Sequence, residues 1–218
     1  MFTGDLLLHS RVNAVARANA ADDPGLSYDY GSLLAPIAPL VEAADWAVCH
    51  LEVPLSADDT RLSPYPTFRV PGDIARAVRA IGYDACTTAS NHVLDQGADG
   101  VAETLAVLDA AGLAHTGSAR SPQEAQPMWL DLGGIRVAHL AYAYGFNGFT
   151  VPSRSPWLAN LLDESRIVAD ADAARRQGAE YVVVSLHWGE QYQHEPNRQQ
   201  QELGPRLLAS PSIDLVVG

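Results

Sequence analysis

The chain alternates short apolar runs with segments in which apolar residues recur at helical spacing. The short runs are typical of buried strands and occupy residues 46–49, 85–88, 137–141, 181–186 and 214–217. The helical pattern occupies residues 74–81, 97–111 and 165–177. Gly112 and Gly178 follow two of these helices, as glycine often does at a helix end. The alternation predicts an α/β fold in which helices cover a sheet.

Two segments rich in proline or glycine connect these elements, at residues 54–71 and 145–156. Neither one separates regions of different composition, and no internal repeat or low-complexity tract occurs. A chain of 218 residues is long enough to form one sizeable hydrophobic core. We therefore expect a single domain over residues 1–218.

The chain starts abruptly, because Phe2 and Thr3 read as the end of a strand whose beginning is missing. No basic leader with an apolar segment occurs, and no apolar run reaches the roughly 18 residues of a membrane span. We expect neither an export signal nor a transmembrane helix in this chain. An upstream leader that has been removed is compatible with this start, so the residues alone leave localisation and oligomeric state undetermined.

Charge and residue usage narrow the possible partners. The 26 acidic and 14 basic residues give a formal net charge of −12, which opposes binding to nucleic acid or anionic lipid. All basic residues are arginines, which excludes a P-loop lysine and a Schiff-base lysine in this chain. Cys49 and Cys86 each lie in an apolar run, which favours two buried free thiols over a disulfide or a metal pair.

Metal-competent side chains recur where a predicted strand ends, which is where open α/β sheets place their sites. They are Asp5, Glu52, the pair Asn91 and His92, and His187. Carboxylate oxygen, amide oxygen and imidazole nitrogen together suit Zn, Mn or Fe. A bridging carboxylate would let two such ions lie about 3.5–4 Å apart.

Each of these residues also has an ordinary structural interpretation. Asp5 follows a glycine and is compatible with the start of a turn, and Glu52 with a solvated loop acid. Asn91 and His92 are compatible with a helix cap, and His187 with a core histidine. The placement of all five at strand ends favours a site. The other histidines are not grouped with metal-competent residues at strand ends. We assign structural roles to His50, His115 and His139, and leave the role of His194 undecided.

Six stretches, in this order, resemble the CapA or PgsA-type poly-γ-glutamate capsule proteins. They are Gly4-Asp5-Leu6-Leu7-Leu8-His9, His50-Leu51-Glu52, Phe68-Arg69-Val70-Pro71, the segment 90–97 that begins Ser90-Asn91-His92, the segment 142–148, and Leu186-His187-Trp188-Gly189 with its continuation to Tyr192. The resemblance extends over essentially the whole chain.

The resemblance implies a metallophosphatase-like α/β/β/α sandwich with two divalent metal ions. Asp5 and His187 match the positions of an aspartate and a histidine that bind metal in the family, and Glu52 takes the place of a bridging aspartate. Asn91 matches an amide ligand, and His92 a general acid near the leaving group. His9 lies close to the first motif, but the familiar Asp-x-His spacing is absent.

The sequence departs from the family pattern in three places. His50 replaces the usual asparagine before Leu51-Glu52, and Gln191 replaces a glutamate before Tyr192. A Gly-His-x-His type segment is expected after residues 215–217, but the sequence ends at Gly218. We therefore expect an incomplete fold that lacks one or two imidazole ligands, weak metal binding and little hydrolysis.

Two functions of different classes follow from the resemblance. The first is a metal-dependent, phosphoesterase-like hydrolase of capsule or cell-envelope polymer metabolism, acting on a phosphoester or an anionic polymer. The second is a non-catalytic component of a polymer synthesis or export machine, which binds an anionic polymer through bound cations. A third interpretation is that the chain is an unrelated α/β enzyme, in which case the six matching stretches would be accidental. The resemblance suggests the bacterial cell envelope or its outer side as the location.

Overall fold

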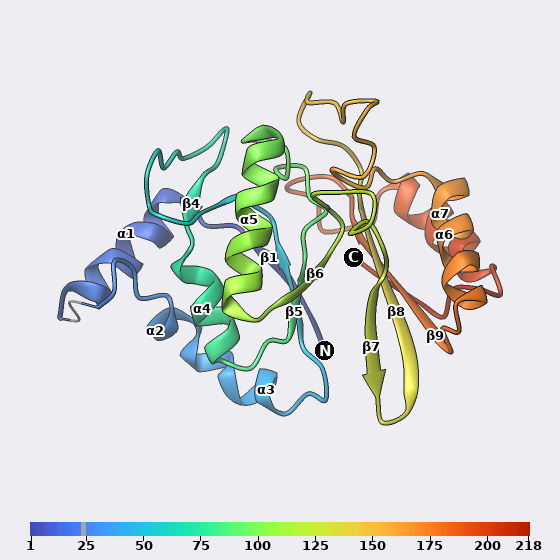
Figure 1. Ribbon diagram of the computed structural model, residues 1–218, viewed down its shortest axis with the longest axis horizontal. Helices are drawn as coiled ribbons and strands as arrows, with labels where there is room; N and C mark the ends of the chain where they lie inside the picture. The colour runs from blue at the N-terminus through green and yellow to red at the C-terminus, as the bar shows by residue number, and fades with distance from the viewer. Residues whose placement is uncertain (23–24) are drawn as a thin grey trace. The chain divides into compact units, whose positions relative to one another are not determined.

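The computed structural model describes residues 1–22 and 25–218, and its contacts divide the chain into two compact units (Figure 1). Unit 1 comprises Met1–Thr88 and His92–His115, and unit 2 comprises Ala89–Asn91 and Thr116–Gly218. The boundary therefore passes twice through the short segment that contains Asn91 and His92. The two predicted site residues of that segment belong to different units.

Unit 1 is built on the sheet β1-β2-β5-β6. Its strands are β1 (Phe2–Leu6), β2 (Val48–Leu51), β5 (Ala85–Thr87) and β6 (Ala114–Thr116), of which β1, β2 and β5 pair in parallel. Its α-helices are α1 (Ser10–Asn19), α2 (Gly31–Leu34), α3 (Ala38–Glu42), α4 (Asp73–Ala80) and α5 (Gly97–Ala111). Two 3₁₀ turns, η1 (Ala20–Asp22) and η2 (Ala35–Ile37), and a short parallel pair, β3 (Leu55–Ser56) with β4 (Val70–Pro71), complete it.

The apolar faces of α4 and α5 supply much of the core of unit 1. Helix α5 buries Val101, Leu105 and Leu108, which share one helical face. It ends at Gly112, whose φ of 73° is the left-handed conformation that glycine adopts at low cost. Helix α5 has the predicted bounds, because burial on one face creates the pattern from which it was predicted. Strand β2 lies two residues later than the predicted run 46–49.

Cys49 and Cys86 form a disulfide, so the prediction of two free thiols is wrong. The two residues face each other in register on the neighbouring parallel strands β2 and β5, with their Cα atoms 4.5 Å apart. This spacing lies within the range that a disulfide requires. The apolar surroundings of each cysteine could be predicted from the sequence, whereas the pairing of β2 with β5 could not.

Unit 2 is built on the sheet β10-β9-β8-β7. Its strands are β7 (Met128–Leu132), β8 (Ile135–Ala143), β9 (Tyr181–His187) and β10 (Leu215–Val217). Strands β8, β9 and β10 are parallel, and β7 is antiparallel to β8. The helices α6 (Glu164–Arg176) and α7 (Arg198–Leu208) pack on this sheet, as the orange and red ribbons of Figure 1 show.

One core cluster explains why α6 and α7 cover this sheet. Alternate residues of β8 and β9, such as Tyr142 and Val184, point to the same face because side chains alternate along a strand. Ile167 of α6 and Leu207 of α7 are buried against them. Helix α7 starts with a capping box in which Asn197 and Gln200 satisfy each other's backbone N–H groups. The parallel strands thus carry His187 to the edge of a well-packed sheet.

The α/β class predicted from the sequence is confirmed. Each unit contains one four-stranded sheet with its own helices, which are the components of the expected two-sheet fold. No helix in the described part of the chain is long and apolar enough to cross a membrane. The single domain predicted over residues 1–218 remains a prediction, since the described chain forms two compact units.

Candidate metal centre

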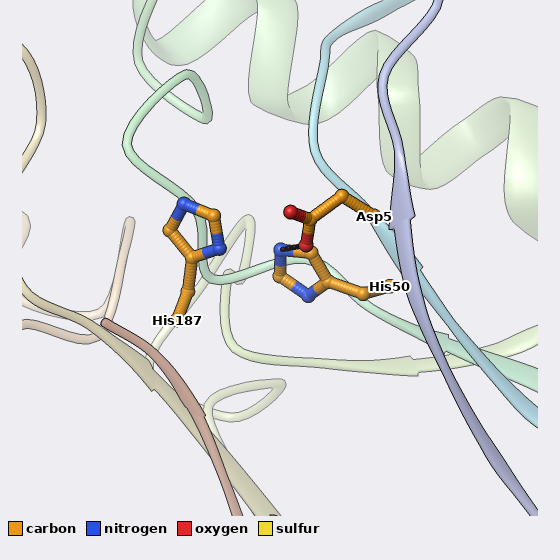
Figure 2. A group of neighbouring side chains, drawn as sticks. All are labelled: Asp5, His50 and His187. Carbon is orange, nitrogen blue, oxygen red and sulfur yellow. Dashed lines mark ion pairs between the residues drawn. The ribbon is translucent and has the colours of Figure 1, made fainter. Parts of the chain in front are cut away.

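In unit 1, strand pairing brings Asp5 and His50 together. The two residues are directly opposite each other on the parallel strands β1 and β2. The Nε2 atom of His50 lies 3.8 Å from Oδ1 of Asp5, as the dashed line in Figure 2 marks. On its other side, Nδ1 of His50 lies 2.7 Å from the hydroxyl oxygen of Thr87 on β5. Because Thr87 holds one ring nitrogen, the ring presents the other one to Asp5.

Glu52 follows β2 immediately and is 5% exposed. Its backbone N–H donates to the carbonyl oxygen of Leu6, 3.4 Å away, which continues the β1–β2 pairing past the end of the strand. A buried carboxylate is costly in free energy unless positive charge or hydrogen bonds compensate it. Since residues 50 and 52 are two apart in extended backbone, their side chains lie on the same face.

A second pair in unit 1 consists of His92 and Asp95, in the turn after β5. The Nδ1 atom of His92 lies 2.7 Å from Oδ2 of Asp95, and both residues are buried. The same oxygen accepts the backbone N–H of Phe68 at 2.7 Å. The Phe68 ring in turn meets the His92 ring edge to face, with the ring centroids 4.8 Å apart. With Asp95 as acceptor, Nδ1 carries a hydrogen, and Nε2 is the nitrogen that can exchange a proton with a substrate.

His9 lies at the other side of Phe68. It is the residue before α1, and its ring meets the Phe68 ring edge to face at 5.1 Å. It also stacks on Tyr65 at 6.4 Å. The structure therefore places His9 in an aromatic group with Tyr65 and Phe68, and its role as a metal ligand remains a prediction.

In unit 2, Asn91 and His187 are hydrogen-bonded to each other. His187 is the last residue of β9, and its Nε2 lies 3.0 Å from Oδ1 of Asn91. The Nδ2 atom of Asn91 donates to Oδ1 of Asn147 at 3.3 Å, which fixes the amide so that its oxygen faces the histidine. Tyr144 stacks on the His187 ring at 5.9 Å, and its backbone N–H donates to the His187 carbonyl. Two candidate ligand atoms are thus held close together.

The donor atoms in both units suit a transition-metal ion. Asp5 and His50 in unit 1, and His187 in unit 2, each offer one metal-ligand atom, and Figure 2 labels all three. Two ligand atoms that are each about 2.1 Å from one ion lie roughly 3.0–3.4 Å apart, depending on the coordination angle. The Asn91–His187 separation of 3.0 Å falls in this range, and the Asp5–His50 separation of 3.8 Å is slightly larger. Each unit therefore offers histidine or aspartate side chains that suit a metal ion, Asp5 and His50 in unit 1 and His187 in unit 2.

Comparisons with known proteins place the chain in a family. The family model described as "Bacterial capsule synthesis protein PGA_cap" matches residues 1–218. The chain belongs to the PGA_cap family. It is 22% identical to the PGA biosynthesis protein CapA of Bacillus subtilis over 100% of this chain and 55% of that protein. It is 23% identical to the capsule biosynthesis protein CapA of Bacillus anthracis over 84% of this chain and 46% of that protein.

The chain is also similar to a mycobacterial protein and to a protein of solved structure. A probable polyglutamine synthesis accessory protein of Mycobacterium tuberculosis is 25% identical over 81% of this chain and 49% of its own length. The sulfate thiohydrolase SoxB of Thermus thermophilus is 18% identical, with a TM-score of 0.48, over 85% of this chain and 32% of that one. This PGA_cap chain spans about half the length of the curated relatives that it matches.

Three residues near the candidate ligands of this PGA_cap chain went unrecognised in the sequence. His50, which was assigned a structural role, lies beside Asp5. Its position two residues before Glu52 could have revealed it, because both side chains must share a face. Asp95 and Asn147 orient His92 and Asn91 respectively. Asp95 was recognisable as an acid three residues after a histidine, whereas nothing in the sequence linked Asn147 to Asn91, which precedes it by 56 residues.

Proposed function

We propose that this PGA_cap protein is a metal-dependent, phosphoesterase-like hydrolase that acts in capsule or cell-envelope polymer biosynthesis. The observation that carries this proposal is the buried pair of His92 and Asp95 in unit 1. An imidazole oriented by a carboxylate, in the unit that also presents Asp5, His50 and Glu52, is an arrangement suited to acid–base chemistry beside a metal ion.

The proposal assigns metal ligands in each unit. Unit 1 offers Asp5, His50 and Glu52, with His9 as a further candidate, and unit 2 offers Asn91 and His187. Two divalent ions of Mn, Zn or Fe suit this mixture of carboxylate, amide and imidazole donors. When bound, such ions would polarise a phosphoryl oxygen and lower the pKa of a coordinated water. Glu52 is the residue that we assign to bridge the two ions.

The residues of the chain have separable tasks in this proposal. His92 donates a proton from Nε2 to the departing oxygen of the substrate. Asp95 accepts the Nδ1 hydrogen and keeps the ring oriented for that transfer. Phe68 covers one side of the His92 ring and limits the access of water there. Asn147 holds the Asn91 amide with its oxygen toward His187.

The test is a screen of phosphomonoesters and phosphodiesters with Mn or Zn, made with wild-type protein and two histidine variants. His92→Asn should lower kcat by about 10²–10⁴-fold, the usual contribution of a general acid. His115→Asn is the matched control, because His115 lies in unit 1 but contacts Asp109. Turnover that survives in His92→Asn at the wild-type rate would contradict the assignment of the general acid.

A separate pair of variants tests the bridging role of Glu52. Glu52→Gln should lower metal occupancy, whereas Glu42→Gln, at the exposed end of α3, should not. Circular dichroism must show that both variants are folded. Equal metal content in the two would remove Glu52 from the site.

The alternative function is a non-catalytic component that binds an anionic polymer through bound cations. The name of one relative supports it, since that protein is called a probable polyglutamine synthesis accessory protein. A chain with a net charge of −12 repels a polyanion. Binding of an anionic polymer would therefore require bound metal ions, and its affinity would fall as the salt concentration rises. Metal-dependent polymer binding without turnover of any substrate in the screen would favour this alternative.

The proposed location is the bacterial cell envelope or its outer side. Membership of a capsule synthesis family supports this assignment. The disulfide between Cys49 and Cys86 also supports it, because such bonds persist mainly in oxidising compartments. Fractionation of the native host, followed by detection of the protein with an antibody, would test it.

A further inference from the structure

Unit 1 contains a pocket of about 320 Å³ that none of the candidate metal ligands lines. One wall is a face of α1 that carries Asn13, Ala14 and Arg17, and the opposite wall is the loop that leads into β4, with Pro64 and Arg69. Figure 1 shows α1 in blue and this loop in teal. Since a water molecule occupies about 30 Å³ of liquid, the pocket has room for roughly ten heavy atoms. Its volume falls in the range of small-molecule sites.

The charged side chains that the structure describes in the lining of this pocket are positive. Among the residues whose side chains the structure describes, Arg17 and Arg69 line it and no acidic side chain does. In a chain with a net charge of −12, a lining of this kind departs from the average surface. A pocket with such a lining attracts anions and repels cations.

The two arginines contribute differently. Arg69 is 6% exposed, and its Nη2 is paired with Glu103 while its Nε donates to the Thr60 carbonyl at 3.1 Å. Its charge is therefore largely compensated and its guanidinium is fixed. Arg17 is exposed and makes no ion pair or hydrogen bond with the side chains that the structure describes, those of residues 1–21 and 25–218. Among the side chains that the structure describes, Arg17 thus supplies most of the uncompensated positive charge in the pocket.

The wall formed by α1 is held in place before any ligand binds. Asn13 donates from Nδ2 to the Leu8 carbonyl at 3.1 Å and accepts from the hydroxyl of the buried Tyr30 at 2.7 Å. Tyr28, which also lines the pocket, stacks on Tyr30 with the ring centroids 6.2 Å apart. A wall that is already ordered loses little conformational entropy on binding.

We propose that this pocket is a binding site for an anionic oxygen group, either a carboxylate or a phosphate, carried on a short aliphatic segment. Arg17 would pair with the anion, and Arg69 would add a fixed guanidinium. Ala14, Leu62 and Pro64 provide an apolar wall for the aliphatic part. This inference goes beyond the proposed hydrolysis and does not depend on it, because the pocket requires neither a metal ion nor His92.

The test uses the full 218-residue chain freed of metal with EDTA, so that an anion cannot bind through a metal ion. Isothermal titration with inorganic phosphate and with glutarate gives the affinity for each kind of anion and so distinguishes the two sources. Arg17→Gln should weaken binding of the preferred anion by about tenfold or more, the loss expected for one charge-assisted contact. Arg11→Gln, on the same helix and also exposed but outside the pocket, should change it less than about twofold.

A third variant tests the place of binding without changing charge. Ala14→Leu adds bulk to the α1 wall and should abolish binding, while circular dichroism confirms that the helix is retained. Three results would overturn the proposal. They are the absence of saturable binding of both anions to the wild-type chain, equal losses in Arg17→Gln and Arg11→Gln, and unchanged binding in Ala14→Leu.

Discussion

The two units position their candidate ligands by different means. In unit 1, the register of a parallel sheet places Asp5 opposite His50, and the neighbouring strand anchors the His50 ring through Thr87. In unit 2, Asn91 belongs to a three-residue segment that joins the unit from elsewhere in the chain, and its side chain is held by His187 and Asn147. Strand pairing determines the first arrangement, and side-chain contacts determine the second.

This difference predicts where each unit is vulnerable. The sheet of unit 1 carries a covalent cross-link directly beside His50 and Thr87, because Cys49 and Cys86 are their neighbours in sequence. The sheet of unit 2 has no cysteine and depends on its buried apolar cluster. Loss of the cross-link should therefore lower the stability of unit 1 most, and small changes in packing should lower the stability of unit 2 most.

The largest effect on stability is expected for the double variant Cys49→Ala/Cys86→Ala. The disulfide closes a loop with a sequence separation of 37 residues, and loop closure of that size stabilises a fold by about 4 kcal/mol. Urea unfolding of the wild type and the variant measures this loss for unit 1. Dithiothreitol should lower the stability of the wild type by a similar amount and leave the variant unchanged. A loss below about 1 kcal/mol would show that strand pairing alone holds the sheet.

The second prediction concerns the pH dependence of unit 2. His139 is fully buried on β8, with Nε2 2.7 Å from the Ser185 hydroxyl, and burial lowers the pKa of its imidazole from 6.5 to about 4. Between these two values the unfolded chain binds a proton at this histidine that the folded chain does not. Stability should therefore fall as the pH falls from about 6.5 to 4, by on the order of 3 kcal/mol.

The variant His139→Gln tests whether this histidine is responsible. Its stability at pH 7 should be lower than that of the wild type, because a buried contact is altered, but its stability should change less with pH. Urea midpoints measured between pH 7 and 4.5 give the slope of stability against pH for the wild type and for the variant. An unchanged slope in His139→Gln would assign the acid sensitivity to other groups.

A smaller effect is expected for Gly117→Ala, which tests the anchoring of the Asn91 segment. A Cβ atom on Gly117 would lie 2.6 Å from the backbone nitrogen of Ala89, two residues before Asn91, and the φ of Gly117 is 111°. The substitution should lower the free energy of unfolding by about 1–3 kcal/mol. It should also weaken metal binding, because it displaces Asn91. Gly133→Ala is the matched control, since φ there is 65° but no atom lies within 4 Å. Equal costs in the two variants would mean that the close approach to Ala89 contributes nothing.

The sequence predicted the central helices and strands well, because burial on one face imposes a period that can be recognised. Helix α5 was predicted with its observed bounds, and α4 and α6 to within one residue at each end. Helices α1 and α7 were missed, because both are rich in polar residues and α7 contains Pro205. The Asn197–Gln200 capping box was the one signal that could have revealed α7.

The candidate site was predictable in its residue types and less so in its pairings. Asp5, Glu52, Asn91 and His187 could be proposed from their places after strands, because parallel strands end at a common edge. The partners that orient them depend on which strands and loops are neighbours in space. His50 beside Asp5 and Asn147 beside Asn91 are contacts of this kind, as is the disulfide.

The most direct test of the metal-dependent account is the metal content of single-ligand variants from each unit. The wild type, Asp5→Asn and His187→Gln would be dialysed to equilibrium against the same buffer containing Mn or Zn, and the metal bound above the buffer level would be measured by elemental analysis. Asp45→Asn and His115→Gln are controls, since Asp45 is exposed and His115 contacts Asp109. The account predicts bound metal in the wild type and both controls, and a clear loss in Asp5→Asn and in His187→Gln. Metal content that stayed at the wild-type level in both ligand variants would contradict it.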